Sequence, residues 1–164
     1  MPMHYFKLLA TILLTAVSAI ASATSPVTWP VSPSRLSLST PYGTLDVAPS
    51  EYVYESRLRI NNSEVNPAIT GMLNITYAFS TPKAHIALVS INSGSNTCPV
   101  SYRWVILQES GYSVSPEFGS CSDLIKVSAQ GRLLTLQTPS HSAPGQIDVY
   151  TYDGKSIKHK TAKH

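Results

Sequence analysis

Residues 73–91, "LNITYAFSTPKAHIALVSI", hold the clearest structural pattern in the chain. Apolar and polar residues alternate in the first part, with one set on each face: Leu73, Ile75, Tyr77 and Phe79 against Asn74, Thr76 and Ala78. A period of two is typical of a strand that buries one face of a sheet. The second part, residues 85–91, is apolar on both faces, which predicts a strand in the middle of a sheet.

The same alternation extends to both sides of this stretch. In "YVYESRLRI" one face carries Tyr52, Tyr54, Ser56, Leu58 and Ile60, and the other carries Glu55, Arg57 and Arg59. Further short apolar stretches occupy residues 102–107, 124–129, 132–138 and 147–153. Turn signals such as Gln130-Gly131 and Asp153-Gly154 separate them. Because no segment after residue 23 shows three turns of helical periodicity, residues 35–154 are predicted to form a single antiparallel all-β domain, a sandwich or a partly closed barrel.

The two ends of the chain differ from this domain. Residues 1–23 have a weakly basic start, an apolar run and the small residues Ala21 and Ala23, which is the layout of a signal peptide. A Pro-rich lead-in follows at residues 24–34, in which Trp29 is expected to pack onto the domain. We therefore expect a periplasmic or secreted protein. No later apolar run reaches the roughly 20 residues that a membrane-spanning helix needs.

The basic charge is concentrated at the C-terminus. Four of the 12 lysines and arginines lie in residues 155–164: Lys155, Lys158, Lys160 and Lys163. We interpret this segment as a solvated basic tail. A nucleic-acid-binding face needs Lys and Arg clustered on folded elements, so no nucleic-acid partner is expected.

The only two cysteines, Cys98 and Cys121, lie in "TCPVSYRWVILQESGYSVSPEFGSCSD", residues 97–123. Two cysteines in an exported chain predict a disulfide, here across the base of a hairpin that runs out and back. A redox or metal role is the alternative. It would favour a Cys-x-x-Cys spacing, which is absent.

A hairpin held by a disulfide would also present rigid side chains. Its aromatic and charged residues are candidates for binding a protein partner: Tyr102, Arg103, Glu117 and Phe118. The competing interpretation, which we favour, places Trp104 and Phe118 in the core.

The sequences "NTCPVSYRWV" and "VSPEFGSCSDLIKV" resemble a pattern in small exported disulfide-containing β-proteins of Gram-negative bacteria that have no assigned function. The resemblance covers roughly residues 71–152. It rests on the two cysteines, on Tyr102-Arg103 and on residues 116–119. It implies a bacterial source and supplies no activity and no catalytic residue.

No catalytic pattern stands out. The chain has no Gly-x-Ser-x-Gly nucleophile turn, no His-Glu-x-x-His motif and no phosphate-binding glycine loop. His85 is the only histidine within a predicted strand after residue 23, and a structural role is expected for it. His141, His159 and His164 are weak metal candidates in or near the tail. We therefore expect no enzyme activity, no metal and no cofactor.

These observations favour a non-enzymatic exported binding protein with a protein partner. Its narrower form is a periplasmic inhibitor or immunity protein against a secreted toxin or hydrolase. The alternative is an envelope-associated structural or adhesion module. A hydrolase with an unrecognised site is the third hypothesis. The sequence leaves the oligomeric state open.

Overall fold

The computed structural model describes residues 28–51 and 55–163. The signal-peptide prediction and the orientations of Tyr52 and Tyr54 fall outside these residues. Within them the chain forms twelve strands and no helix, and all strand pairs are antiparallel. The predicted all-β class is therefore confirmed, and the sheets do not form a closed barrel.

Two sheets contain all of the strands. The first has eight strands in the order β1-β2-β3-β5-β6-β7-β8, with β4 paired to β3. Its strands are β1 (Ser37–Thr40), β2 (Gly43–Pro49), β3 (Ser56–Ile60), β4 (Ser63–Glu64), β5 (Thr70–Ser80), β6 (Ala84–Asn92), β7 (Val100–Gln108) and β8 (Gly111–Val114). The second sheet has four strands in the order β12-β11-β10-β9. They are β9 (Lys126–Gln130), β10 (Leu133–Pro139), β11 (Gln146–Tyr152) and β12 (Ile157–Lys163).

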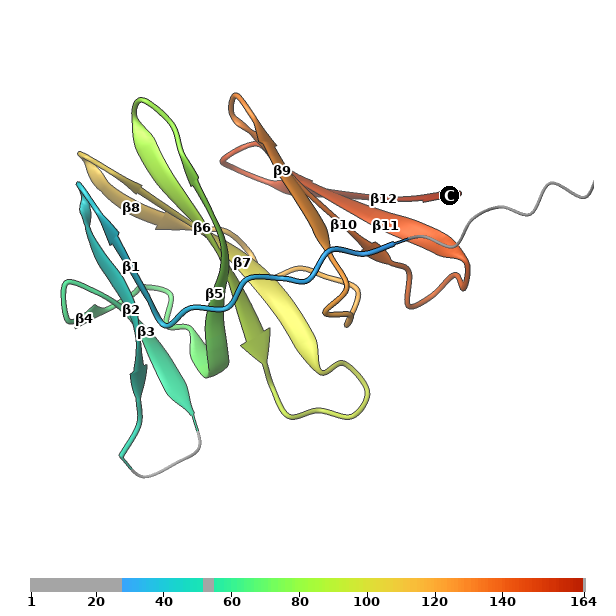
Figure 1. Cartoon of the computed structure of the whole chain (residues 1–164), viewed down its shortest axis with the longest axis horizontal. Helices are drawn as coiled ribbons and strands as arrows, with labels where there is room; N and C mark the ends of the chain where they lie inside the picture. Colours follow the sequence, from blue (N-terminus) through green and yellow to red (C-terminus); the bar gives the residue numbers. More distant parts are fainter. Residues whose placement is uncertain (1–27, 52–54, 164) are drawn as a thin grey trace, which may run out of the picture.

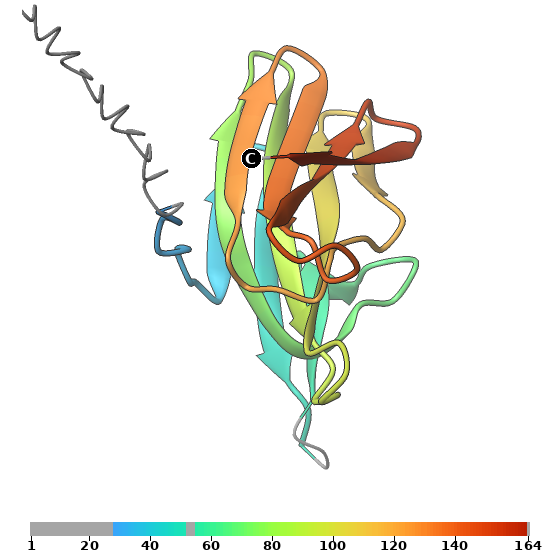
Figure 2. The ribbon, with the colours of Figure 1, turned by 90° about the vertical axis from the view of Figure 1, so that its right-hand side faces the viewer.

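The strands are arranged in three layers (Figure 1). The first sheet bends between β3 and β5, so that β1–β3 make one outer layer and β5–β8 the middle layer. The second sheet makes the other outer layer, seen from its outer side in Figure 2. One apolar cluster fills the space between β1–β3 and the middle layer, and a second fills the space between the middle layer and the second sheet.

Strand β6 lies in the middle of this arrangement and is buried on both faces. Ala87 and Val89 belong to the first cluster, while Ile86 and Leu88 belong to the second. This confirms the central strand predicted from residues 85–91. A strand covered on both faces needs apolar side chains in both directions, which is why it shows no alternation.

Strand β5 corrects one prediction from the sequence. Leu73 and Ile75 belong to the first cluster, but Tyr77 and Phe79 pack against the second. The register of β5 against β6 shifts between Ile75 and Tyr77, at Thr76. An extra residue at a bulge turns the following side chains to the opposite face. One strand thereby serves both clusters, and the single face expected from the alternation is wrong.

The lead-in crosses the middle layer before β1 begins. Arg35 exchanges two backbone hydrogen bonds with Ile75, at 3.2 and 2.9 Å. The half-buried Trp29 ring lies 5.3 Å from Nζ of Lys126 on β9, which is a cation–π contact. Trp29 therefore packs onto the domain, as predicted.

The basic tail is also corrected: it is strand β12. Seven consecutive residue pairs join it to β11, from Tyr152–Ile157 to Gln146–Lys163. Asp153 forms the turn between the two strands by accepting hydrogen bonds from the backbone N–H groups of Lys155 and Ser156. The sequence of this segment resembles that of a solvated tail because an edge strand exposes most of its side chains. The backbone of β12 is nevertheless hydrogen-bonded to β11.

Candidate functional site on the second sheet

The disulfide forms as predicted, at the base of the β7–β8 hairpin. Cys98 and Cys121 are 23 residues apart, and their Cα atoms are separated by 4.5 Å. No free cysteine remains in the described part of the chain. A structural disulfide is consistent with a location outside the cytoplasm. The described residues include no helix long and apolar enough to cross a membrane.

The four candidate partner-binding residues divide into two pairs, and the first pair is buried. Tyr102 is 1% exposed and Phe118 is 8% exposed. Their backbones exchange two hydrogen bonds, at 2.8 and 3.0 Å, and the hydroxyl of Tyr102 donates to the carbonyl of Ser122. Burial raises the pKa of Tyr102. An interface role for these two side chains is therefore wrong, and the core interpretation of Trp104 and Phe118 holds.

Gly119 explains how the loop closes over this pair. Its φ is +133°, and a Cβ at this position would lie 3.0 Å from Cδ2 of Tyr102. A larger residue would be strained and would also press on the ring. The conformation after Phe118 therefore depends on glycine.

The second pair, Arg103 and Glu117, lies at the surface but is engaged within the protein. Their charged groups are 3.5 Å apart. Arg103 also donates to the carbonyl of Ser115, and Glu117 accepts a 2.6 Å hydrogen bond from the hydroxyl of Ser101. These contacts fix the hairpin and leave few free groups for a partner.

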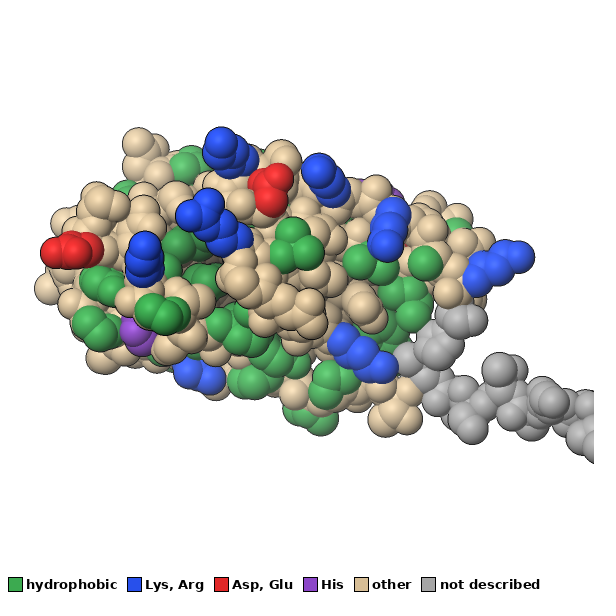
Figure 3. All heavy atoms as spheres, turned by 90° about the horizontal axis from the view of Figure 1, so that it is seen from above, with side chains coloured by type: hydrophobic (Ala, Val, Ile, Leu, Met, Phe, Trp, Pro, Cys, Tyr) green, Lys and Arg blue, Asp and Glu red, His purple; other side chains and the backbone are tan. Residues whose placement is uncertain are grey.

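The second sheet offers a more distinct surface, because its basic residues outnumber its acidic ones. Its strands and turns carry six lysines and arginines: Lys126, Arg132, Lys155, Lys158, Lys160 and Lys163. Of its two acids, Asp148 is buried and Asp153 caps its own turn. In the described part of the chain, none of the six lies within 4.0 Å of a carboxylate. Figure 3 looks onto the molecule from the top of Figure 1, across both sheets, and on that side basic side chains outnumber acidic ones.

Among residues 28–51 and 55–163, strand β12 is the edge of this sheet and pairs only with β11. His159 and Thr161 point inward, because both contact the buried Asp148. Side chains alternate along a strand, so Lys158 and Lys160 point to the outer face. The edge thus combines free backbone groups with two outward cations.

Asp148 is the centre of a buried polar network behind β12. Its carboxylate accepts hydrogen bonds from Ser120 at 2.5 Å, Thr161 at 2.7 Å and His159 at 2.9 Å. The hydroxyl of Tyr150 is 2.8 Å from that of Ser120, and its ring stacks on His159 with centroids 4.6 Å apart. The network joins β11 and β12 to the loop that carries the disulfide.

Burial raises the pKa of Asp148, but the hydrogen bonds from Ser120, Thr161 and His159 outweigh this effect and lower the pKa to about 2. The carboxylate is therefore ionised at neutral pH. It acts as the acceptor that holds the hydroxyl and imidazole donors in place.

Although the network contains Ser, His and Asp, its order differs from that of a catalytic triad. In a triad the histidine lies between the nucleophile and the carboxylate. Here both Ser120 and His159 contact the carboxylate directly. This geometry anchors the strands, with the hydroxyl of Ser120 donating to the carboxylate and not to a histidine.

The sequence contained one sign of this network. Asp148 shares a strand face with Tyr150 and Tyr152, where an apolar residue would be expected. Its partners at positions 120, 159 and 161 are distant in sequence, so the pattern within one strand does not reveal them.

The network predicts a specific loss of stability in acid. The pKa of Asp148 is about 2 in the folded protein against an ordinary 3.8, so its contribution is complete above about pH 4 and is lost as pH falls toward 2. This contribution is about 2 kcal/mol. Urea unfolding between about pH 2 and 6 should show that Asp148→Asn removes this part of the pH dependence.

Ser120→Ala should weaken the same pH dependence, since it removes one of the donors. Ser128→Ala is the matched control, because Ser128 is exposed on β9. The role assigned to this carboxylate would be contradicted if the free energies of unfolding of wild type and Asp148→Asn changed with pH in the same way.

Comparisons with protein-family models, with curated proteins and with solved structures found no match for this chain.

Proposed function

We propose that this chain is an exported, non-enzymatic binding protein that docks an acidic protein partner on the basic edge strand β12. One observation carries the proposal. The edge presents Lys158 and Lys160 outward, and the acids of its sheet, Asp148 and Asp153, are both occupied within the protein. A surface with one sign of charge favours a partner of the opposite sign.

The backbone of β12 supports this mode of binding. An edge strand exposes a row of N–H and C=O groups to which an extended segment of a partner adds as a further strand. Strand β12 is seven residues long and is paired to β11 without a bulge. It is therefore regular enough to continue the sheet.

The lysines supply selectivity in this arrangement. Opposite charges directly across a strand pair stabilise it by roughly 0.2–1 kcal/mol each, while like charges destabilise it. Lysines on an edge also oppose pairing with a second copy of the same edge. An acidic strand is thus accepted and a basic one is rejected.

The narrower form of the proposal is an inhibitor or immunity protein against a secreted toxin or hydrolase. Many hydrolases carry carboxylates in their clefts, for example the paired acids of glycosidases. A lysine-bearing strand on a rigid sheet is suited to such a cleft. The predicted export of the chain would place it in the same compartment as a secreted enzyme.

A second candidate is the envelope-associated module, which the same basic charge favours. Anionic envelope surfaces attract clustered lysines without any strand pairing. The two functions differ in one respect: a protein partner would need both the backbone of β12 and its charges, whereas an anionic surface needs only the charges.

Charge reversal on β12 tests the proposal. The partner is first isolated from periplasmic and secreted fractions with the oxidised protein as bait. We expect Lys158→Glu/Lys160→Glu to weaken its Kd at least about tenfold, because attraction becomes repulsion. Arg35→Glu makes the same kind of charge change at an exposed position outside the second sheet and should leave the Kd unchanged. Circular dichroism checks that each variant folds.

Hydrogen exchange then separates the two functions. Strand addition should protect backbone amides of β12 when the partner is bound. Binding to vesicles that contain anionic phospholipid, with no protected β12 amides and no stoichiometric protein partner, would favour the envelope module instead. A Kd unaffected by the double reversal in a folded protein would overturn the proposed docking edge.

A further inference from the structure

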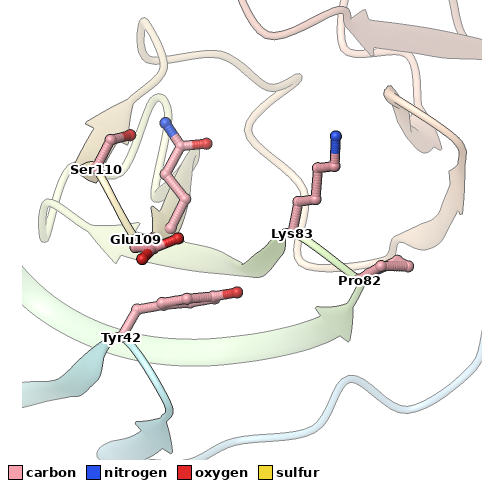
Figure 4. A pocket seen from close by; sticks show the side chains of 6 residues that line it. Tyr42, Pro82, Lys83, Glu109 and Ser110 are labelled. Carbon is pink, nitrogen blue, oxygen red and sulfur yellow. The ribbon is translucent and has the colours of Figure 1, made fainter.

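Three hairpin turns meet at the end of the molecule where β1 runs into β2. They are the β1–β2 turn, the β5–β6 turn and the β7–β8 turn. Between them lies a hollow of about 440 Å³, lined by Tyr42, Pro82, Lys83, Gln108, Glu109 and Ser110. Figure 4 shows these side chains around the open space.

Tyr42 forms the floor of this hollow. Its ring is half-buried and contacts His85 edge to face, with centroids 5.8 Å apart at 70°. The turn is fixed by a hydrogen bond from the backbone N–H of Tyr42 to Oγ1 of Thr40. In Figure 4 the ring is seen edge-on below Glu109, so one face is turned toward the hollow. A fixed aromatic face is thereby offered to a ligand.

The walls of the hollow carry charged groups of both signs and two uncharged polar groups. Lys83 projects from the β5–β6 turn and Glu109 from the β7–β8 turn. In the described part of the chain, neither lies within 4.0 Å of an opposite charge. Gln108 and Ser110 add an amide and a hydroxyl beside Glu109. Within the residues that the structure describes, none of these four side chains forms a hydrogen bond, so each is available to a ligand.

These features restrict the chemistry of the ligand. An apolar ligand would leave the polar walls without partners, which costs free energy. A purely anionic ligand would be repelled by Glu109, and a purely cationic ligand would be repelled by Lys83. A ligand without net charge therefore suits these walls best, and one that is rich in hydroxyl groups and flat on one side would use the polar groups and the aromatic ring together.

We infer that this hollow binds a saccharide, one or two sugar units of a glycan. The C–H face of a sugar ring would stack on Tyr42, while its hydroxyls would donate to Glu109 and accept from Gln108 and Lys83. A volume of about 440 Å³ lies at the lower end of the range for small-molecule sites and is suited to a ligand of this size. The site is on the first sheet and is independent of the function proposed for β12.

The test is a titration of the oxidised ¹⁵N-labelled protein followed by NMR. Three probes are used: cellotriose, N-acetylated chitotriose and trigalacturonate. We expect at least one of the two uncharged trisaccharides to shift the amides of Tyr42, Lys83 and residues 108–110, with a Kd at or below about 1 mM. Trigalacturonate should bind more weakly, because its carboxylates face Glu109.

Variants assign the binding to particular groups. Tyr42→Ala should weaken the Kd at least about tenfold by removing the stacking surface. Glu109→Gln, on an exposed turn, should weaken binding of the uncharged sugar and reduce the discrimination against trigalacturonate. Glu55→Gln is the matched control, since Glu55 is an exposed carboxylate outside the hollow.

Two results would overturn the inference. One is the absence of shifts at these turns with all three probes up to about 10 mM, which corresponds to negligible affinity. The other is sugar binding that is unaffected by Glu109→Gln and by Gln108→Ala. Both substitutions lie on exposed positions, so the inference stays testable even if Tyr42→Ala fails to fold.

Discussion

Replacing Phe118 by alanine is expected to lower the free energy of unfolding by about 3–5 kcal/mol, the cost of deleting a large buried ring. Phe118 lies among three other aromatic rings, with centroids 6.3 Å from Tyr102, 6.4 Å from Trp104 and 5.5 Å from Tyr150. Its removal would leave a cavity between the middle layer and the second sheet. Guanidinium unfolding followed by tryptophan fluorescence measures the effect.

The neighbouring residue provides the control. Glu117→Ala removes a surface ion pair with Arg103 and the hydrogen bond from Ser101, and it should cost about 1 kcal/mol. The contrast between these adjacent positions separates a core residue from a surface residue on the same loop. A Phe118→Ala variant within about 1 kcal/mol of wild type would show that the ring is not part of the core.

Removal of the disulfide is expected to cost about 3 kcal/mol. The bond closes a loop between residues 23 apart, and without it the unfolded chain regains the freedom that this loop had lost. For a small domain whose total stability is commonly about 5–15 kcal/mol, this is a large share. The Cys98→Ser/Cys121→Ser variant should therefore unfold at a clearly lower denaturant concentration than the oxidised wild type.

Reduction of the wild type supplies a second route to the same state. Wild type with reductant and the double variant without it should have similar free energies of unfolding. The double variant itself should not respond to reductant. Equal stability of the variant and the oxidised wild type would mean that the loop is held mainly by other contacts, such as the backbone pair between Tyr102 and Phe118.

The local features of this fold could be predicted from the sequence because their causes are local. Alternation in β3, continuous apolarity in β6 and the glycine turns all act between residues close in the chain. The pairing of Cys98 with Cys121 also followed, since the chain has only these two cysteines. In the segment between them, the sequence left open whether Phe118 faces the core or a partner.

The remaining features depended on contacts between distant segments. The bulge at Thr76 moves Tyr77 to the other cluster only because a third layer exists to receive it. Likewise, "IKHKTAK" becomes a strand because β11 offers it a backbone edge, although its lysines suggest a solvated tail. A period-two pattern within one strand reveals neither the layer that receives Tyr77 nor the strand that pairs with β12.

The same division holds for the functional surfaces. The sequence by itself determined the residue types: many lysines near the C-terminus, an aspartate in a strand and a tyrosine in a turn. Tertiary structure decided what they do, by placing the lysines on a paired edge, surrounding Asp148 with donors from distant positions, and gathering three turns around Tyr42. The physical reason is that side-chain chemistry is local, whereas charge exposure, hydrogen-bond satisfaction and cavities depend on which surfaces the folded chain brings together.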